Sequence, residues 1–167
     1  IAVATLAKIC EENKTQLIHI STDYVFDGTA NQPYKETDKT NPVSVYGKSK
    51  LQGEDWAIQN APLTIIIRTA WLYSSFKNNF VKTMLRLMKE KESINVVSDQ
   101  LGCPTYAADL AAAIMHIIAS GKSKDQPGIY HYSNADSVLD TSKIKETFAV
   151  AIPDWVNSLE KCLGLLK

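Results

Sequence analysis

Two hydrophobic patterns alternate along the chain, one with the period of a helix and one typical of buried strands. Apolar residues at positions 1, 3, 6, 9 and 10 follow the helical period and predict an amphipathic helix over residues 1–13. Apolar, β-branched runs predict strands at 17–22, 63–69, 94–97 and 129–132. The run at 63–69 is of the kind expected for a parallel strand that is covered on both faces.

Helical segments separate these strands. We expect them at 44–60, from residues 78–79 to the charged run at 89–92, from a cap at Pro104-Thr105 to residue 120, and from residue 154 to residue 166. Ser44 and Asp154 are the expected N-caps of the first and the last of these helices. Strands that are separated by helices predict an α/β fold with a Rossmann-like, doubly wound parallel sheet.

Two stretches interrupt the regular pattern. Residues 27–43 are rich in Asp, Gly, Asn, Pro and Thr and predict an irregular loop, which we expect to help close a site. Gly47 and Gly53 lie within the 44–60 helix, where small side chains permit the close approach of another backbone. We prefer this packing interpretation to a phosphate-binding role.

Composition narrows the class of protein. The chain has 167 residues, and its 45% of apolar residues suffice for the core of one domain. With 18 basic and 18 acidic residues the formal charge is zero, which gives no reason to expect a nucleic acid or a membrane surface as a partner. No apolar run approaches the length of about 20 residues that spans a bilayer, and no signal peptide is recognisable. We therefore expect a cytoplasmic protein.

The cysteines and histidines do not predict a metal site. Cys10, Cys103 and Cys162 are odd in number and widely spaced, which argues against a disulfide framework and against zinc. The three histidines share no ligand spacing, and His19 and His116 lie in apolar segments, where a structural histidine is expected. We therefore expect no metal ligands in this chain.

Tyr46 and Lys50 lie four residues apart at the start of the 44–60 helix, so that their side chains share one helix face. A tyrosine hydroxyl, with an ordinary pKa of about 10, is a poor acid at neutral pH. A fixed cation nearby favours the phenolate and lowers that pKa toward the working range. The pair is a candidate acid-base site, although the same spacing is common on surface helices.

Polar and aromatic residues follow two of the predicted strands. Thr22 and Asp23 come at the end of strand 17–22, and Trp71 follows strand 63–69. In open α/β sheets the ligands collect beyond the carboxyl ends of the strands, which places these three residues at one edge. The structural alternatives are a polar turn for Thr22 and Asp23 and an ordinary core aromatic for Trp71.

Five short segments of the chain form a joint pattern. They read Ser-Thr-Asp-Tyr-Val-Phe-Asp-Gly at 21–28, Val-Tyr-Gly-Lys-Ser-Lys-Leu at 45–51, Arg-Thr-Ala-Trp-Leu-Tyr at 68–73, Asn-Asn-Phe at 78–80 and Asp-Gln-Leu-Gly-Cys-Pro-Thr at 99–105. Together they resemble the extended short-chain dehydrogenase/reductase family, and within it the branch that reduces dTDP-4-dehydrorhamnose to dTDP-rhamnose. The resemblance runs over nearly the whole chain.

The resemblance implies hydride transfer from NADPH or NADH to a keto sugar that is attached to a nucleotide. Tyr46 would protonate the carbonyl oxygen, while Lys50 would hold the nicotinamide ribose and lower the pKa of Tyr46. Thr22 would hydrogen-bond the reacting oxygen, and Asp23 would contact the sugar beside it. Trp71 would form an apolar wall against the sugar. The implied partners are the sugar-nucleotide substrate and, through the 44–60 helix, a second subunit of a homodimer.

Two other functions remain open. A nucleotide-sugar epimerase or dehydratase shares the Tyr-x-x-x-Lys pair, although the Arg-Thr-Ala-Trp segment favours the reductase. A non-catalytic subunit of the type that regulates methionine adenosyltransferase shares the fold and binds a dinucleotide. The presence of Thr22, Tyr46, Lys50 and Trp71 together argues against such a scaffold, because a scaffold needs no acid-base residues.

The expected domain organisation takes into account that one family motif, a glycine turn, is not recognisable. None of the seven glycines forms the Gly-x-x-Gly-x-x-Gly turn that binds a dinucleotide in the resembled family. The resemblance therefore assigns residues 1–75 and 98–120 to the latter part of the dinucleotide-binding domain. It assigns 76–97 and 121–167 to a smaller, incomplete sugar-nucleotide domain with a discontinuity near 134–137. The region that selects NAD or NADP is not recognisable, so the preference stays open.

Overall fold

The computed structural model describes residues 1–135 and 138–166. Its elements in chain order are α1 (Ala2–Glu12), β1 (Ile18–Thr22), the 3-10 helix η1 (Asp23–Val25), α2 (Val45–Asn60), β2 (Ile65–Thr69), β3 (Leu72–Tyr73), α3 (Phe80–Glu90), β4 (Thr105–Tyr106), α4 (Ala107–Ala119), β5 (Gly128–Tyr132), α5 (Ser142–Phe148) and α6 (Trp155–Gly164). The five helices and three of the four strands predicted from the sequence pattern are therefore confirmed.

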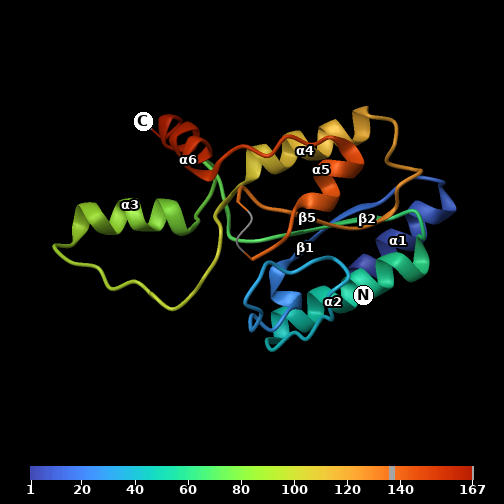
Figure 1. Ribbon diagram of the computed structural model, residues 1–167, viewed down its shortest axis with the longest axis horizontal. Coiled ribbons are helices and arrows are strands. Elements are labelled where there is room, and N and C mark those ends of the chain that lie inside the picture. The colour runs from blue at the N-terminus through green and yellow to red at the C-terminus, as the bar shows by residue number, and fades with distance from the viewer. Residues whose placement is uncertain (136–137, 167) are drawn as a thin grey trace.

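The main sheet is parallel and has the order β1-β2-β5. The strands end in register, with Thr22 opposite Thr69 and Thr69 opposite Tyr132. Helices α1 and α2 lie on one side of this sheet, and α4 and α5 lie on the other (Figure 1). This arrangement confirms the predicted Rossmann-like, doubly wound α/β fold.

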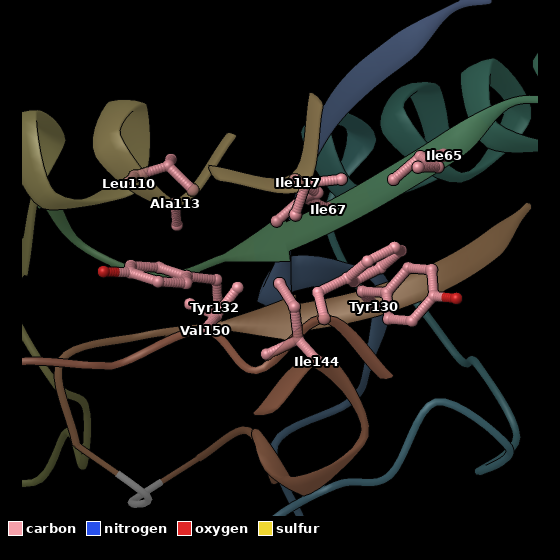
Figure 2. Packing of buried hydrophobic residues seen from close by; sticks show 10 residues of the cluster. Ile65, Ile67, Leu110, Ala113, Ile117, Tyr130, Tyr132, Ile144 and Val150 are labelled. Atoms are coloured by element: carbon pink, nitrogen blue, oxygen red, sulfur yellow. The ribbon is translucent and has the colours of Figure 1, made fainter. Parts of the chain in front are cut away.

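The larger core lies between the sheet and the α4–α5 layer. Figure 2 shows Ile65 and Ile67 of β2 beside Tyr130 and Tyr132 of β5, with side chains of α4 and α5 packed against them. Because side chains alternate along a strand, Ile66 of β2 points to the opposite face, toward α2. All five residues of β2 are buried, which confirms that this strand is covered on both faces.

The start of α2 fits tightly against η1. Ser44 caps the helix, since its Oγ accepts a hydrogen bond from the Gly47 N–H at 3.0 Å. A Cβ added at Gly47 would lie 2.1 Å from the carbonyl oxygen of Tyr24, and one at Gly53 would lie 3.4 Å from Val3 of α1. The packing interpretation of both glycines is confirmed, and only glycine fits at position 47.

Two predictions about local structure were wrong. Residues 94–97 are not a strand, because no neighbouring strand pairs with their backbone in the described structure. Thr105 does not cap α4, because it lies in β4, which pairs in parallel with β3. The cap position of α4 is taken by Tyr106, whose side chain makes no capping hydrogen bond.

The loop of residues 27–43 packs away from the predicted site. Asp27 accepts hydrogen bonds from the Tyr34 hydroxyl at 2.7 Å and from the Asn41 amide at 3.1 Å. Tyr34 also forms a parallel bridge with Leu139 near the end of the chain. The expected discontinuity at 134–137 falls partly on Asp136 and Ser137, which lie outside the described residues.

Helix α3 and the segment that follows it extend away from the sheet (Figure 1). Asn79 caps α3 by accepting a hydrogen bond from the Lys82 N–H at 3.2 Å, but no residue of the helix is fully buried. Across the described ranges, no helix combines the length and the apolarity that crossing a bilayer requires.

Candidate active site

A cavity of about 810 Å³ opens at the carboxyl ends of β1 and β2. The five residues that the sequence analysis singled out all line it: Thr22, Asp23, Tyr46, Lys50 and Trp71. They come from three places in the chain, namely the end of β1, the start of α2 and the turn after β2. The fold therefore brings together residues that are up to 49 positions apart in sequence.

Tyr46 and Lys50 stand on the first turns of α2 with different surroundings. Tyr46 is 55% exposed, and its ring meets that of Tyr24 edge to face with the centroids 5.9 Å apart. The Lys50 ammonium donates a hydrogen bond of 2.6 Å to the carbonyl oxygen of Ile20 in β1. Burial lowers the pKa of Lys50, and the charge of Glu54 one turn further along α2 opposes that shift. The ammonium is thus fixed at the sheet edge, while the phenol remains open to the cavity.

Thr22 and Asp23 form a small polar unit at the end of β1. The Thr22 hydroxyl donates to Asp23 Oδ1 at 3.0 Å and accepts from the Tyr24 N–H at 3.3 Å. Burial raises the pKa of the Asp23 carboxyl, and the hydrogen bond from Thr22 opposes this effect. A hydroxyl has a single proton, so Thr22 can donate either to Asp23 or to a ligand in the cavity, but not to both.

Two further hydroxyls at the same edge have no hydrogen-bond partner among the residues that the structure describes. Ser21 Oγ of β1 and Thr69 Oγ1 of β2 are buried without a hydrogen bond, and both residues line the cavity. A buried hydroxyl without a partner is costly, which favours a polar ligand that satisfies it. Neither residue was assigned a role from the sequence, although Ser21 precedes the last residue of the predicted strand 17–22 and Thr69 is the last residue of the predicted strand 63–69.

A buried ion pair lies directly behind the site. Arg68 of β2 and Glu54 of α2 make a hydrogen bond of 2.7 Å from Nη2 to Oε2 and one of 3.0 Å from Nε to Oε1. The Arg68 guanidinium also stacks over the Phe26 ring, 5.1 Å from its centroid. This pair was not predicted from the sequence, although an arginine inside an apolar strand requires a buried acid as its partner.

Trp71 forms one wall of the cavity. The side chain is 39% exposed, so it is not an ordinary core aromatic, and its backbone has a φ of 44°. The Trp71 carbonyl accepts a hydrogen bond of 3.1 Å from the Thr105 N–H, which joins the turn to β4. The indole therefore lines the cavity on a turn that is hydrogen-bonded to the segment carrying β4.

The side of the cavity that α3 and the segment after it form is mostly apolar, with Asn95 and Gln100 as its polar residues. It is lined by residues of α3 and of the segment that follows it, among them Phe80, Val81, Met84, Val96 and Val97. The sequence predicted α3 but not its position at the site. The loop of residues 27–43, which we had expected to help close the site, contributes no lining residue, so this expectation was wrong.

The described part of the chain holds no cluster of three or more His, Cys, Asp or Glu side chains that could bind a metal ion. Cys103 and Cys162 are buried, and Cys162 packs with Tyr73 and Tyr106 between β3, β4 and α6. The polar side chains that line the cavity are the hydroxyls of Ser21, Thr22 and Thr69, the Asp23 carboxyl, the Lys50 ammonium, the phenols of Tyr24, Tyr46 and Tyr73, the Trp71 indole N–H and the amides of Asn95 and Gln100.

Comparison of the chain with known proteins identifies its family. Residues 1–138 match the RmlD substrate binding domain. The dTDP-4-dehydrorhamnose reductase of Sinorhizobium fredii is 45% identical over 151 residues, which cover 89% of this chain and 51% of that protein. The enzyme of the same name from Aggregatibacter actinomycetemcomitans is 44% identical over 205 residues, which cover 95% of this chain and 69% of that protein.

Solved structures agree with this relationship. The crystal structure of dTDP-4-dehydrorhamnose reductase from Bacillus anthracis in complex with NADP superimposes with a TM-score of 0.92 at 31% identity, covering 99% of this chain and 70% of that chain. The chain spans about half the length of the Sinorhizobium fredii relative. Residues 1–138 match the family model, and the relatives named above are similar over nearly the whole chain. The chain therefore belongs to the RmlD family of the short-chain dehydrogenase/reductase fold, together with the dTDP-4-dehydrorhamnose reductases.

Proposed function

We propose that the chain carries the catalytic site for the NAD(P)H-dependent reduction of dTDP-4-dehydro-L-rhamnose to dTDP-L-rhamnose. The observation that carries the proposal is that Thr22, Asp23, Tyr46, Lys50 and Trp71 line one cavity at the carboxyl edge of a parallel sheet. The names of the relatives supply the substrate. Because the chain spans 51% of the first of these relatives, we assign the activity to a full-length protein that contains it.

The residues at the sheet edge fit a nicotinamide. When bound, the reduced nicotinamide supplies the hydride that reaches the carbonyl carbon of the sugar. The ammonium of Lys50 is held at the end of β1 and would hydrogen-bond the ribose hydroxyls. The unpartnered hydroxyls of Ser21 and Thr69 suit a polar ring substituent such as a carboxamide. These groups favour NADPH or NADH as the cofactor without choosing between them.

Proton transfer is the role of Tyr46. Its phenol is exposed to the cavity and free to meet a carbonyl oxygen, to which it would donate its proton as the hydride arrives. Thr22 would turn its single proton from Asp23 to the same oxygen and stabilise the developing negative charge. Asp23, left without that hydrogen bond, would accept one from a sugar hydroxyl.

The rest of the substrate extends toward the mostly apolar side of the cavity. Trp71 would lie against the sugar, and the α3 side would contact the remainder of the nucleotide.

The proposed domain assignment follows from this placement. We keep residues 76–97 as part of the substrate domain and residues 1–75 and 98–120 as part of the dinucleotide-binding domain. β5 and α5 fall in the range 121–167, but β5 pairs with β2 in the main sheet and α5 packs on it, which favours grouping them with the sheet.

The deciding experiment is NADPH oxidation by the full-length protein with and without dTDP-4-dehydrorhamnose. We expect oxidation only when the sugar nucleotide is present. An epimerase or dehydratase would convert a nucleotide sugar without net oxidation of NADPH. A regulatory subunit would bind the dinucleotide without turnover. Light scattering on the same sample would test the proposal that the protein is a homodimer.

A further inference from the structure

The backbone of Trp71 adopts a conformation that side chains with a Cβ rarely adopt. Its φ of 44° lies in the left-handed region, and nothing in the sequence after β2 demands such a turn. The turn is held by the Thr105 N–H, which donates to the Trp71 carbonyl, and by the parallel pairing of β3 with β4. The direction of the indole is therefore set by a segment that lies more than 30 residues further along the chain.

Gly102 of that segment lies directly against the indole. A Cβ added at Gly102 would come within 2.4 Å of Cε2 and 2.5 Å of Cζ2 of Trp71. Carbon atoms in contact are normally 3.5–4.0 Å apart, so the ring occupies the space that any side chain at position 102 would fill. The next residue, Cys103, is buried, so the segment has little room to retreat.

The backbone of Gly102 gives no other reason for a glycine. The glycines of the described chain with positive φ are Gly28, Gly121 and Gly128, and Gly102 is not among them. Alanine can therefore adopt the backbone conformation of position 102. The three heavy atoms nearest to such a Cβ all belong to the indole of Trp71. Gly102 itself does not line the cavity.

We propose that Gly102 is a positioning residue for Trp71, whose missing side chain lets the indole lie back on the 99–105 segment and sets the width of the sugar site. The inference rests on the proposed function, in which Trp71 contacts the sugar. A methyl group at position 102 would push the indole toward the cavity and narrow the site. Binding of the sugar nucleotide would suffer, whereas cofactor binding would not.

The test is a double-mutant cycle in the full-length protein. Gly102→Ala should raise the KM for the sugar nucleotide roughly tenfold, the low end of what one misplaced methylene costs in a binding pocket, and leave the KM for NADPH unchanged. In the Trp71→Ala background, Gly102→Ala should change the KM by less than about twofold, because the ring that it displaces is gone. Gly164→Ala is the matched control, since a Cβ there meets nothing within 4 Å.

A second readout needs no substrate. In protein labelled with 5-fluorotryptophan, the ¹⁹F resonance of Trp71 is identified by its loss in Trp71→Phe. Gly102→Ala should shift this resonance and leave those of Trp56 and Trp155 in place. If the protein reduces no sugar nucleotide, the proposed function fails, but the resonance still tests the contact.

Three outcomes would overturn the inference. The first is an unmoved Trp71 resonance in Gly102→Ala, and the second is an equal rise of KM in the wild-type and Trp71→Ala backgrounds. The third concerns folding: should Gly102→Ala fail to fold, the double variant with Trp71→Ala must fold. A double variant that also fails would mean that something other than the indole requires a glycine at this position.

Discussion

Arg68 and Glu54 form a buried ion pair that joins β2 to α2, with side chains that are 3% and 1% exposed. Glu54 lies four residues after Lys50 and eight after Tyr46, so these three side chains share one face of α2. The pair therefore fixes the helix face that carries the proposed acid-base residues. The ion pair therefore contributes to the stability of the fold and also holds α2, with Tyr46 and Lys50, in place against β2.

Removal of one partner of this pair should be strongly destabilising. Glu54→Gln leaves the Arg68 guanidinium buried without a counter-charge, and we expect a loss of about 3 kcal/mol in the free energy of unfolding. Urea denaturation monitored by circular dichroism measures it. The matched control is Glu90→Gln, which breaks the exposed pair of Arg86 and Glu90 and should cost less than about 0.5 kcal/mol. Similar losses in the two variants would mean that the buried pair has no special role.

Substitution of the proposed proton donor should separate activity from folding. Tyr46→Phe removes only a hydroxyl from a ring that is more than half exposed, so the melting temperature should not change. We expect kcat of the full-length protein to fall by about 100-fold, the usual scale of general acid catalysis. Tyr24→Phe, on the neighbouring ring, is the control and should keep its turnover. A near-normal kcat in Tyr46→Phe would show that Tyr46 is not the proton donor.

The ammonium of Lys50 should contribute to cofactor affinity. Lys50→Met loses the hydrogen bond to the Ile20 carbonyl and the donor that we assign to the ribose, and the Kd for NADPH should rise by about ten- to hundredfold. Fluorescence titration of the full-length protein measures this change. Lys48→Met, two positions earlier on an exposed part of α2, should bind NADPH normally. An unaltered Kd in Lys50→Met would place the cofactor elsewhere.

The buried imidazole of His131 should make the fold sensitive to acid. Burial and the nearby Arg68 charge lower its pKa to about 3, and the neutral ring lies 3.1 Å from the Tyr34 carbonyl through Nδ1. Below the unfolded pKa of about 6.5 the unfolded chain binds a proton that the native chain does not, so stability falls as the pH falls. Between pH 6 and pH 4 this single group should cost about 1 kcal/mol per pH unit. His131→Gln should flatten that dependence, and an unchanged slope would refute the account.

A polypeptide of only these 167 residues should bind the dinucleotide poorly. Phosphate binding in this fold uses a glycine turn that lets backbone N–H groups approach the pyrophosphate, and none of the seven glycines forms that turn. Lys50 would hold the nicotinamide end alone. Titration of this polypeptide with NADPH should therefore show no saturable micromolar binding. Such binding, if measured, would show that the phosphates are held by other groups.

Local sequence determined the elements whose hydrogen bonds close within a few residues. Ser44, Asn79 and Asp154 cap α2, α3 and α6 because each side chain reaches an N–H group two or three positions further along. The apolar run of β2 predicted a strand covered on both faces, because no other environment suits it. The short motifs likewise predicted five residues that line one cavity, since the carboxyl ends of parallel strands meet at one edge.

Only the tertiary structure decided which distant segments meet. Residues 94–97 have strand propensity but no partner, whereas β3 and β4 are only two residues long and pair across a separation of 33 positions. A strand requires a neighbour that accepts its hydrogen bonds, and local propensity does not supply one. The contacts of Arg68 with Glu54 and of Gly102 with Trp71 likewise arise only after the elements have packed, because each depends on the fit of surfaces that sequence spacing does not encode.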